Sequence, residues 1–178
     1  MKKLIALAAM AFSIACYAQN NNPLWLRYPA ISPDGKTIVF SFKGDLYRVS
    51  GSGGDAVPIT LNEAYDYMPV WSHDGKWIAF ASDRYGNFDV YIMPSTGGEA
   101  KRLTYNSAND YPYDFSVDDK KVLFGTARND VYTSARFPQR ALFQKLYEVP
   151  STGGRSVMVL SAGSEFAHFN KSGDKIIF

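Results

Sequence analysis

Polar turns and short apolar strands alternate along this chain in a repeated order. Four segments, residues 32–40 (SPDGKTIVF), 72–80 (SHDGKWIAF), 116–124 (SVDDKKVLF) and 170–178 (NKSGDKIIF), each place a polar turn before an apolar strand that ends in Phe. Between them, Tyr47, Tyr91 and Tyr147 lie in second apolar strands, and a Gly-Gly pair begins six residues after each Tyr. Asp-Gly and Gly-Gly pairs are typical of tight turns, because Gly tolerates positive φ. The pattern therefore predicts antiparallel strands joined by short turns.

The spacing of these segments indicates a structural repeat. From each Tyr to the Phe of the next copy the steps are 33, 33 and 31 residues, whereas from Phe to Tyr within a copy they are 7, 11 and 23. A repeat of about 40 residues built from short strands is typical of a β-propeller. We expect an all-β fold, a β-propeller of four-stranded antiparallel blades at about residues 28–61, 68–105, 112–160 and 167–178. The last blade is incomplete, so we expect a truncated propeller of three blades and the start of a fourth.

The N-terminal segment has the pattern of a secretory signal. Lys2 and Lys3 precede an apolar stretch that is too short to span a bilayer, and a small residue, Ala18, ends it. We expect residues 1–18 to be a signal peptide cleaved before Gln19, residues 19–27 to be a lead-in, and the protein to be exported to the periplasm. Lipoprotein processing at Cys16 is the alternative. Cys16 is the only cysteine, so either route leaves no cysteine pair for a disulfide and no Cys-ligated metal site.

The balance of basic and acidic residues limits the kinds of partner that the chain is expected to bind. The chain carries 19 basic and 17 acidic residues, and loss of Lys2 and Lys3 with the signal would leave 17 of each. A neutral balance argues against nucleic acid as a partner. No segment after the signal is apolar enough to predict a transmembrane helix.

Two groups of residues look like chemical sites but are better explained as turns. Ser72, His73 and Asp74 are contiguous in a turn, whereas the members of a catalytic triad converge from separate segments. Asp83, Asn87 and Asp89 share a loop without the spacing of an EF-hand, and turn chemistry around Gly86 is the better account. We expect no catalytic residue, no metal and no cofactor in this chain.

The connections between repeats hold the candidate binding residues. Two matching connections end in Asp66-Tyr67 and Asp110-Tyr111, and each leads into the strand expected nearest the propeller channel. These aspartates either bind backbone amides and hold neighbouring blades together or form a polar rim that contacts a ligand. Arg and aromatic residues of the second and third blades lie in connections expected on the same face, and such residues are enriched at recognition surfaces. The full candidate set is Asp66, Tyr67, Arg84, Tyr85, Asp110, Tyr111, Arg128, Tyr132, Arg136 and Arg140.

The connection at residues 126–145 is the longest of its kind. Residues 135–146 could form a short helix interrupted by Pro138, and Phe137 and Phe143 add apolar surface. The connection could recognise a ligand or simply pack beneath the neighbouring blade, and the sequence leaves both interpretations open.

Three motifs resemble the repeat of TolB-type propellers: residues 32–40, residues 82–91 (SDRYGNFDVY) and residues 97–104 (GGEAKRLT). The opening residues 24–29 (LWLRYP), with residues 65–71 (YDYMPVW), resemble more closely the exported tricorn-like serine peptidases of the tail-specific, C-terminal-processing type. In that family a propeller precedes a PDZ module and a protease core.

The resemblance implies a propeller segment that gates or recognises peptide substrate, with the catalytic domain outside this chain. It implies peptide or protein substrates and downstream PDZ and protease domains of the same chain as partners. Further copies of the chain, in a homo-oligomer, are another candidate partner. The alternative is a non-catalytic TolB-like periplasmic scaffold that binds protein partners.

Overall fold

The computed structural model describes residues 25–128 and 144–178, and these residues form strands and turns without a helix. Three four-stranded antiparallel sheets and one two-stranded sheet follow one another along the chain. The first sheet contains β1 (Arg27–Ile31), β2 (Thr37–Phe42), β3 (Asp45–Ser50) and β4 (Val57–Pro58). The second contains β5 (Asp66–Trp71), β6 (Trp77–Ser82), β7 (Asp89–Pro94) and β8 (Lys101–Arg102). The third contains β9 (Asp110–Phe115), β10 (Lys121–Thr126), β11 (Lys145–Pro150) and β12 (Val157–Leu160), and the last pairs β13 (His168–Phe169) with β14 (Ile176–Ile177).

The turn between the first two strands of a sheet is built by its own side chains. In the first sheet the Ser32 hydroxyl donates to Asp34 Oδ1 at 2.6 Å, and the Lys36 N–H donates to the same oxygen at 3.1 Å. The Thr37 N–H then donates to Ser32 Oγ at 2.9 Å. The second and third sheets repeat all three contacts, which explains why Ser and Asp recur two residues apart.

The Phe and Tyr that recur in the sequence are direct partners across the second and third strands. Phe40 pairs with Tyr47, Phe80 with Tyr91 and Phe124 with Tyr147 in the antiparallel ladders. Their ring centroids lie 6.0, 5.8 and 5.8 Å apart. The apolar strands predicted around Tyr47, Tyr91 and Tyr147 are the third strands of their sheets, and the three tyrosines occupy equivalent places in them.

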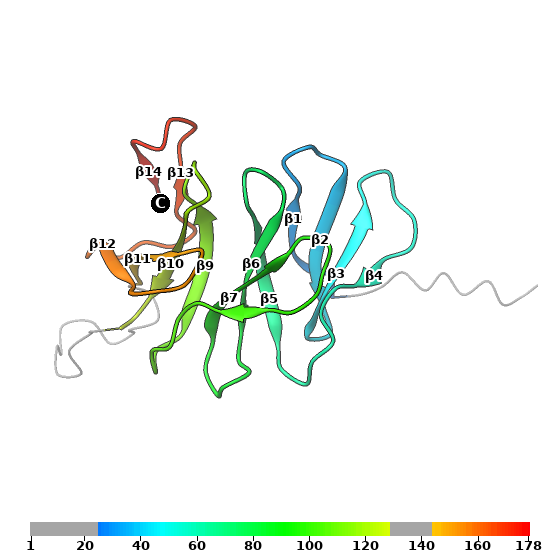
Figure 1. Ribbon diagram of the computed structural model, residues 1–178, viewed down its shortest axis with the longest axis horizontal. Coiled ribbons are helices and arrows are strands. Elements are labelled where there is room, and N and C mark those ends of the chain that lie inside the picture. Colours follow the sequence, from blue (N-terminus) through cyan, green and yellow to red (C-terminus); the bar gives the residue numbers. More distant parts are fainter. Residues whose placement is uncertain (1–24, 129–143) are drawn as a thin grey trace, which may run out of the picture.

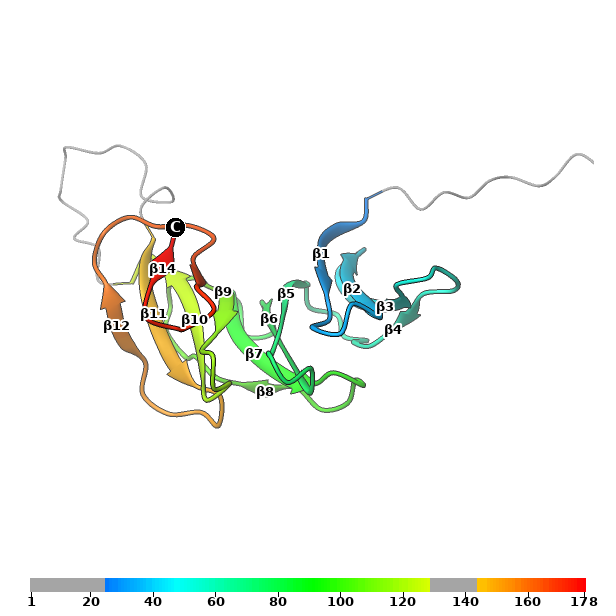
Figure 2. The same cartoon turned by 90° about the horizontal axis from the view of Figure 1, so that it is seen from above.

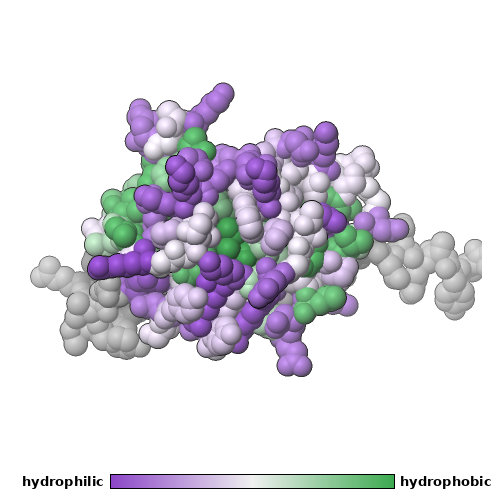
Figure 3. Space-filling view, in the orientation of Figure 1, coloured by the Kyte–Doolittle hydropathy of each residue, from purple (hydrophilic) through white to green (hydrophobic). Residues whose placement is uncertain are grey.

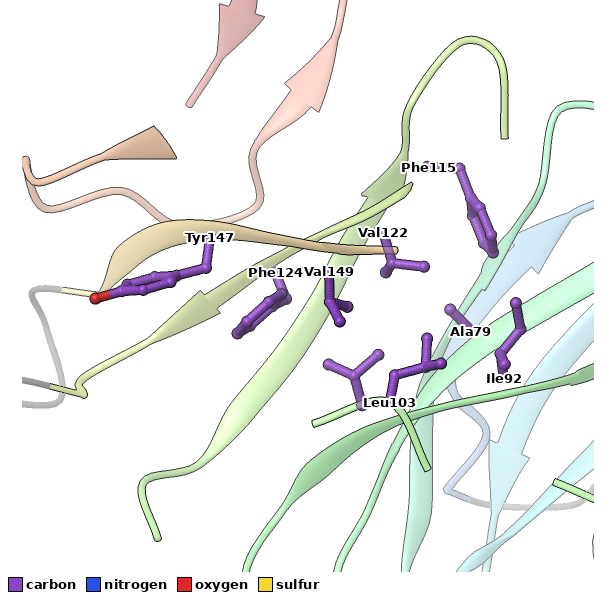
Figure 4. Packing of buried hydrophobic residues seen from close by; sticks show 9 residues of the cluster. Ala79, Ile92, Leu103, Phe115, Val122, Phe124, Tyr147 and Val149 are labelled. Atoms are coloured by element: carbon purple, nitrogen blue, oxygen red, sulfur yellow. The ribbon is translucent and has the colours of Figure 1, made fainter. Parts of the chain in front are cut away.

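Apolar cores fill the space between neighbouring sheets. Val39, Leu46 and Ile59 of the first sheet cluster with Ile78, Phe80, Tyr91 and Met93 of the second. A larger cluster joins the second sheet to the third (Figure 4), and its members include Ala79, Ile92, Leu103, Phe115, Val122, Phe124, Tyr147 and Val149. Because both faces of the inner strands are covered, these strands read as continuous apolar runs without a two-residue period.

The sheets are arranged as propeller blades. Their first strands are neighbours in space, since β1 contacts β5, β5 contacts β9 and β9 contacts β13. Figure 2 shows the sheets fanned out, with β1, β5 and β9 on the inner side and β4, β8 and β12 toward the outside. The expected all-β propeller architecture is therefore confirmed.

The two ends of the sheets form two different faces. The turns after β1, β5, β9 and β13 lie along the upper edge of Figure 1, and we call this end the turn face. The opposite end, the loop face, carries the connections after β2 and β6 and those that lead into β5 and β9. Ladder pairs place Asp66, Ser82 and Asp89 together at this end. Figure 3 shows a largely hydrophilic surface in the view of Figure 1, with smaller hydrophobic patches on the side of β12, β13 and β14, near the middle and on the side of the first sheet.

Several boundaries differ from those read from the sequence. β5 and β9 begin two residues earlier than expected, because Asp66 and Asp110 pair in the ladder with Ser82 and Thr126. The signal at residues 1–18 lies outside the described residues. Most of the helix expected at residues 135–146 also lies outside them, and its last two positions belong to β11. Asp119 replaces the usual turn Gly and adopts a left-handed φ of 57°. Asp tolerates this conformation better than most residues, so the third turn keeps the hydrogen bonds of the first two.

Candidate functional site

Among the buried ion pairs of the loop face, two occupy equivalent places in the second and third sheets. Asp66 at the start of β5 pairs with Arg84 at 2.9 Å, and Asp110 at the start of β9 pairs with Arg128. Both carboxylates are completely buried, while the arginine side chains are 18% and 10% exposed. Burial raises the pKa of Asp66 and of Asp110, and the neighbouring arginine charge acts in the opposite direction.

Each arginine also lies over the Phe–Tyr pair of its own sheet. The Arg84 guanidinium carbon is 5.5 Å from the Phe80 ring centroid and 5.0 Å from that of Tyr91. Arg128 repeats this arrangement on the third sheet, at 5.0 Å from one ring and 5.1 Å from the other. The arginines therefore close the loop-face end of the apolar core.

The same aspartates join neighbouring sheets through their backbones. The Asp66 N–H donates to the Gly44 carbonyl of the first sheet at 2.7 Å, and the Asp110 N–H donates to the Phe88 carbonyl of the second at 2.8 Å. One of the two interpretations of the sequence had the carboxylates bind backbone amides and so hold neighbouring blades together. Instead, the carboxylates bind arginines within their own sheet, and the backbone N–H groups make the contact between sheets.

An aromatic cluster covers the inner part of the loop face. Tyr67 contacts Tyr28 of the first sheet at 5.3 Å and Tyr111 of the third at 6.0 Å between ring centroids. Phe88 completes the cluster at 4.8 Å from Tyr67, and Tyr65 lies 5.5 Å from Tyr67. Burial raises the pKa of Tyr67, so its phenol stays neutral. Tyr67 and Tyr111, two of the candidate residues, therefore lie together.

Tyr85 is separate from this cluster. Its ring lies 4.6 Å from the Arg102 guanidinium carbon, and Tyr105 lies at the same distance from that arginine. Arg102 in turn pairs with buried Asp89 at 2.6 Å. Tyr85 is thus an exposed residue on the Arg102 stack, apart from Tyr67 and Tyr111.

The long connection of the third sheet leaves and re-enters the sheet at the loop face. Thr126 pairs with Asp110 on one side and with Lys145 on the other, so the connection begins beside Asp110 and ends one strand farther out at the same end of the sheet. Tyr132, Arg136 and Arg140 lie outside the described residues.

A pocket on the inner strands brings together residues that sequence reasoning missed. It is lined by residues of the first strand of all four sheets and by one residue of the connection before β13: Tyr28, Pro29, Met68, Pro69, Val70, Pro112, Tyr113, His168 and, from the connection, Phe166. Tyr28 also belongs to the aromatic cluster, so the pocket and the cluster are continuous. Non-glycine residues with positive φ are rare, yet Tyr28, Met68 and Phe166 all adopt φ values of 50–53°.

A signal for this pocket was present in the sequence. Tyr28, Met68, Pro112 and Phe166 each stand four residues before the first residue of a repeated turn. Recognising it required the knowledge that this position faces the inner side of the blades.

The residues that looked like a catalytic triad or a cation site are used in turns and in contacts between neighbouring sheets. The His73 imidazole contacts Asp119 at 3.0 Å, while the Ser72 hydroxyl donates to Asp74 at 2.7 Å. In the loop at residues 83–89, Asp83 accepts from the Tyr65 N–H at 2.7 Å, and Asn87 donates to the Asn106 carbonyl at 3.0 Å. Within residues 25–128 and 144–178 no three His, Cys, Asp or Glu side chains form a group suited to a metal ion. The described part of the chain also contains no helix long and apolar enough to cross a membrane.

Solved structures of other proteins share this fold. A crystal structure of TolB from Acinetobacter baumannii is 24% identical, and the match covers 85% of this chain and 37% of that chain with a TM-score of 0.67. A crystal structure of the tricorn protease is 16% identical, with 70% of this chain and 13% of that chain covered and a TM-score of 0.55. At these identities the similarity shows the fold alone.

Sequence comparison identifies the family. Dipeptidyl-peptidase 5 of Porphyromonas gingivalis is 35% identical over 71 residues, which are 34% of this chain and 10% of that protein, so the chain spans only a small part of its relative. The profile of the tricorn protease N-terminal beta propeller domain matches residues 23–178. The chain therefore belongs to the family of tricorn protease N-terminal beta propeller domains.

Proposed function

We propose that this propeller segment recognises peptide substrate for an exported, tricorn-like serine peptidase whose catalytic domain lies outside this chain. Family membership and the partial match to a dipeptidyl-peptidase support a role in peptide hydrolysis. The signal-like N-terminal sequence supports export to the periplasm.

The inner-strand pocket is the observation that carries the proposal. Its exposed walls are apolar and aromatic, with Phe166 61% exposed, and the His168 imidazole adds a polar group. Apolar walls with a few polar groups suit the side chains of an extended peptide. The pocket continues through Tyr28 into the aromatic cluster of Tyr67 and Tyr111, which provides a path along the inner strands toward the loop face.

The remaining candidate residues take different parts in this proposal. Asp66, Asp110, Arg84 and Arg128 hold the loop face in shape, because their charges are already paired. Tyr132, Arg136 and Arg140 belong to a connection whose flanks lie on the loop face, so we propose them as additional peptide contacts.

The test uses the full-length protein with unfolded casein, a fluorogenic peptide and a fluorophosphonate probe that labels reactive serines. The wild-type protein is expected to cleave both substrates and to react with the probe. A folded, exported protein that does neither would contradict the peptidase and favour a scaffold role.

A matched pair of variants tests the pocket. Phe166→Ser removes a ring that is 61% exposed from the pocket, and Tyr105→Ser removes a ring that is 71% exposed outside it. The Phe166 ring is expected to contact the substrate equally in the ground state and in the transition state. Its removal should therefore raise KM roughly fivefold to tenfold and leave kcat unchanged. Tyr105→Ser should behave as wild type, and both variants should keep the wild-type melting temperature. Equal KM values in Phe166→Ser and wild type would remove the pocket from substrate recognition.

A further inference from the structure

A second pocket lies on the turn face, between the turns of the first and second sheets. It has a volume of about 470 Å³, and its walls include Asp34 and Gly75 from the two turns and Arg48 from β3. The pocket lies at the opposite end of the sheets from Asp66 and Asp110. It shares no lining residue with the inner-strand pocket proposed for peptide substrate, so the two pockets are distinct.

The equivalent junction between the second and third sheets shows that a carboxylate can bind between two turns. Between the second and third sheets, the Asp119 carboxylate reaches across from the third turn. It accepts the His73 N–H at 2.7 Å and the Asp74 N–H at 2.9 Å from the second turn. A carboxylate thus fits between two adjacent turns and takes its hydrogen bonds from backbone N–H groups.

The residue equivalent to Asp119 in the second turn is Gly75, which has no side chain to offer. A Cβ at Gly75 would lie 3.8 Å from Pro33 Cδ and would meet nothing closer. At the junction of the third and fourth sheets the equivalent Gly173 is already in contact with Val117, whose Cγ2 lies 3.0 Å from the Cβ position. Of these three junctions within the described residues, only the first leaves room for a carboxylate from elsewhere.

The open junction also carries a positive charge. The guanidinium of Arg48 donates to the Ser95 carbonyl at 3.4 Å and has no acidic partner among the described residues. The equivalent positions hold Ile92 in the second sheet and Glu148 in the third, so the arginine is specific to this junction. A guanidinium without an acidic partner suits a carboxylate ligand.

The aspartates that line this pocket are engaged in their own turns. Asp34 Oδ1 accepts the Ser32 hydroxyl and the Lys36 N–H, and Asp74 Oδ2 accepts from Lys76 Nζ at 2.9 Å. The Asp34 N–H, whose counterpart in the second turn binds Asp119, has no acceptor among the described residues.

We propose that this pocket binds the carboxylate of an acidic side chain from a peptide segment of a protein partner. The Asp34 N–H donates to it as the Asp74 N–H donates to Asp119, and the Arg48 guanidinium donates in place of the second backbone donor, because Pro33 at the position of His73 has no N–H. Because the pocket is on the turn face, the partner can bind while the inner-strand pocket is occupied.

The experiment measures fluorescence anisotropy of a labelled, C-terminally amidated hexaglutamate peptide with the full-length protein. Gly75→Asp supplies the carboxylate from within the chain, and the φ of 57° at Asp119 shows that Asp is tolerated in such a turn. Arg48→Gln removes the charge without altering a turn. Each variant should weaken binding roughly tenfold, the ratio that one charge-assisted hydrogen bond supplies.

Gly35→Asp is the matched control. Gly35 and Gly75 have the same φ of 71°, but a Cβ at Gly35 meets no atom within 4 Å. This control adds the same charge to the equivalent turn, and it should bind hexaglutamate as tightly as wild type, with all three variants melting within a few degrees of it.

Three results would overturn the proposal. One is equal affinity of wild type, Gly75→Asp and Arg48→Gln for hexaglutamate. Another is wild-type binding no tighter than that of amidated hexaglutamine. The third is binding of hexaglutamine with a free C-terminus but not of amidated hexaglutamate, which would assign the pocket to a chain terminus.

Discussion

The contact between Asp119 and the second turn should contribute measurably to the stability of the propeller. Replacement by Gly removes a charged acceptor from two N–H groups at 2.7 and 2.9 Å. A hydrogen bond to a charged group contributes about 1.5–3 kcal/mol, so the two together contribute about 3 kcal/mol at the lower end suited to a turn near the surface. Gly also relieves the left-handed backbone at this position, which costs a residue with a side chain about 1 kcal/mol. The expected net loss for Asp119→Gly is therefore about 2 kcal/mol.

Two further variants separate these contributions. Asp119→Ala loses the same hydrogen bonds without relief of the backbone, so it should be about 1 kcal/mol less stable than Asp119→Gly. His73→Ala keeps both backbone donors and loses only the partly exposed imidazole contact, so it should cost less than about 1 kcal/mol.

The assay is urea unfolding of the full-length protein, together with hydrogen exchange of the peptide that contains residues 72–77. The amides of His73 and Asp74 should exchange faster in Asp119→Gly than in wild type. A variant as stable as wild type, with unchanged exchange in this peptide, would refute the account of the Asp119 contact.

Three more outcomes follow from the packing and the charges. Arg84→Met leaves Asp66 buried without a partner and should cost about 3–5 kcal/mol in urea unfolding, and adding Asp66→Asn should restore part of that loss, whereas an additive double variant would contradict the buried pair. Hydrogen bonds from the backbone and side chain of Lys76 lower the pKa of Asp74 from 3.8 to about 2. Stability from this group is therefore complete above about pH 4 and lost as the pH falls toward 2, so Asp74→Asn should flatten the acid side of a melting-temperature profile. Gly125→Ala should cost about 1–3 kcal/mol because the new methyl group would overlap the Tyr113 ring, and a variant as stable as wild type would contradict this packing.

The repeat could be predicted from the sequence because its physical causes are local. A Ser and an Asp two residues apart form the hydrogen bonds of the turn, and the apolar strand that follows pairs with the strand that contains the regularly spaced Tyr. The strand order, the Phe–Tyr register and the equivalence of Tyr47, Tyr91 and Tyr147 follow from these local rules.

The sites depended on contacts between sheets, which the sequence does not show directly. The equal spacing of Asp66 from Arg84 and of Asp110 from Arg128 was visible, but the pairing follows from a ladder that brings the end of the second strand beside the start of the first. Asp119 stands where the other turns have Gly, and its carboxylate binds a neighbouring sheet whose position is set by the core between blades. The inner-strand pocket could not be predicted, because its residues, such as Met68 and Phe166, share a place in the repeat but not a residue type.

The most direct test of substrate recognition is photo-crosslinking from the inner-strand pocket. Full-length protein would carry benzoylphenylalanine in place of Phe166 or, as the control, in place of Tyr105, with the reactive serine blocked by a fluorophosphonate so that bound peptide stays intact. We predict that a biotinylated peptide substrate is captured from position 166 and not from position 105, and that excess unlabelled peptide abolishes the capture. Equal capture from both positions, or none from position 166 in a protein that hydrolyses the same peptide before blocking, would contradict the assignment of this pocket to substrate.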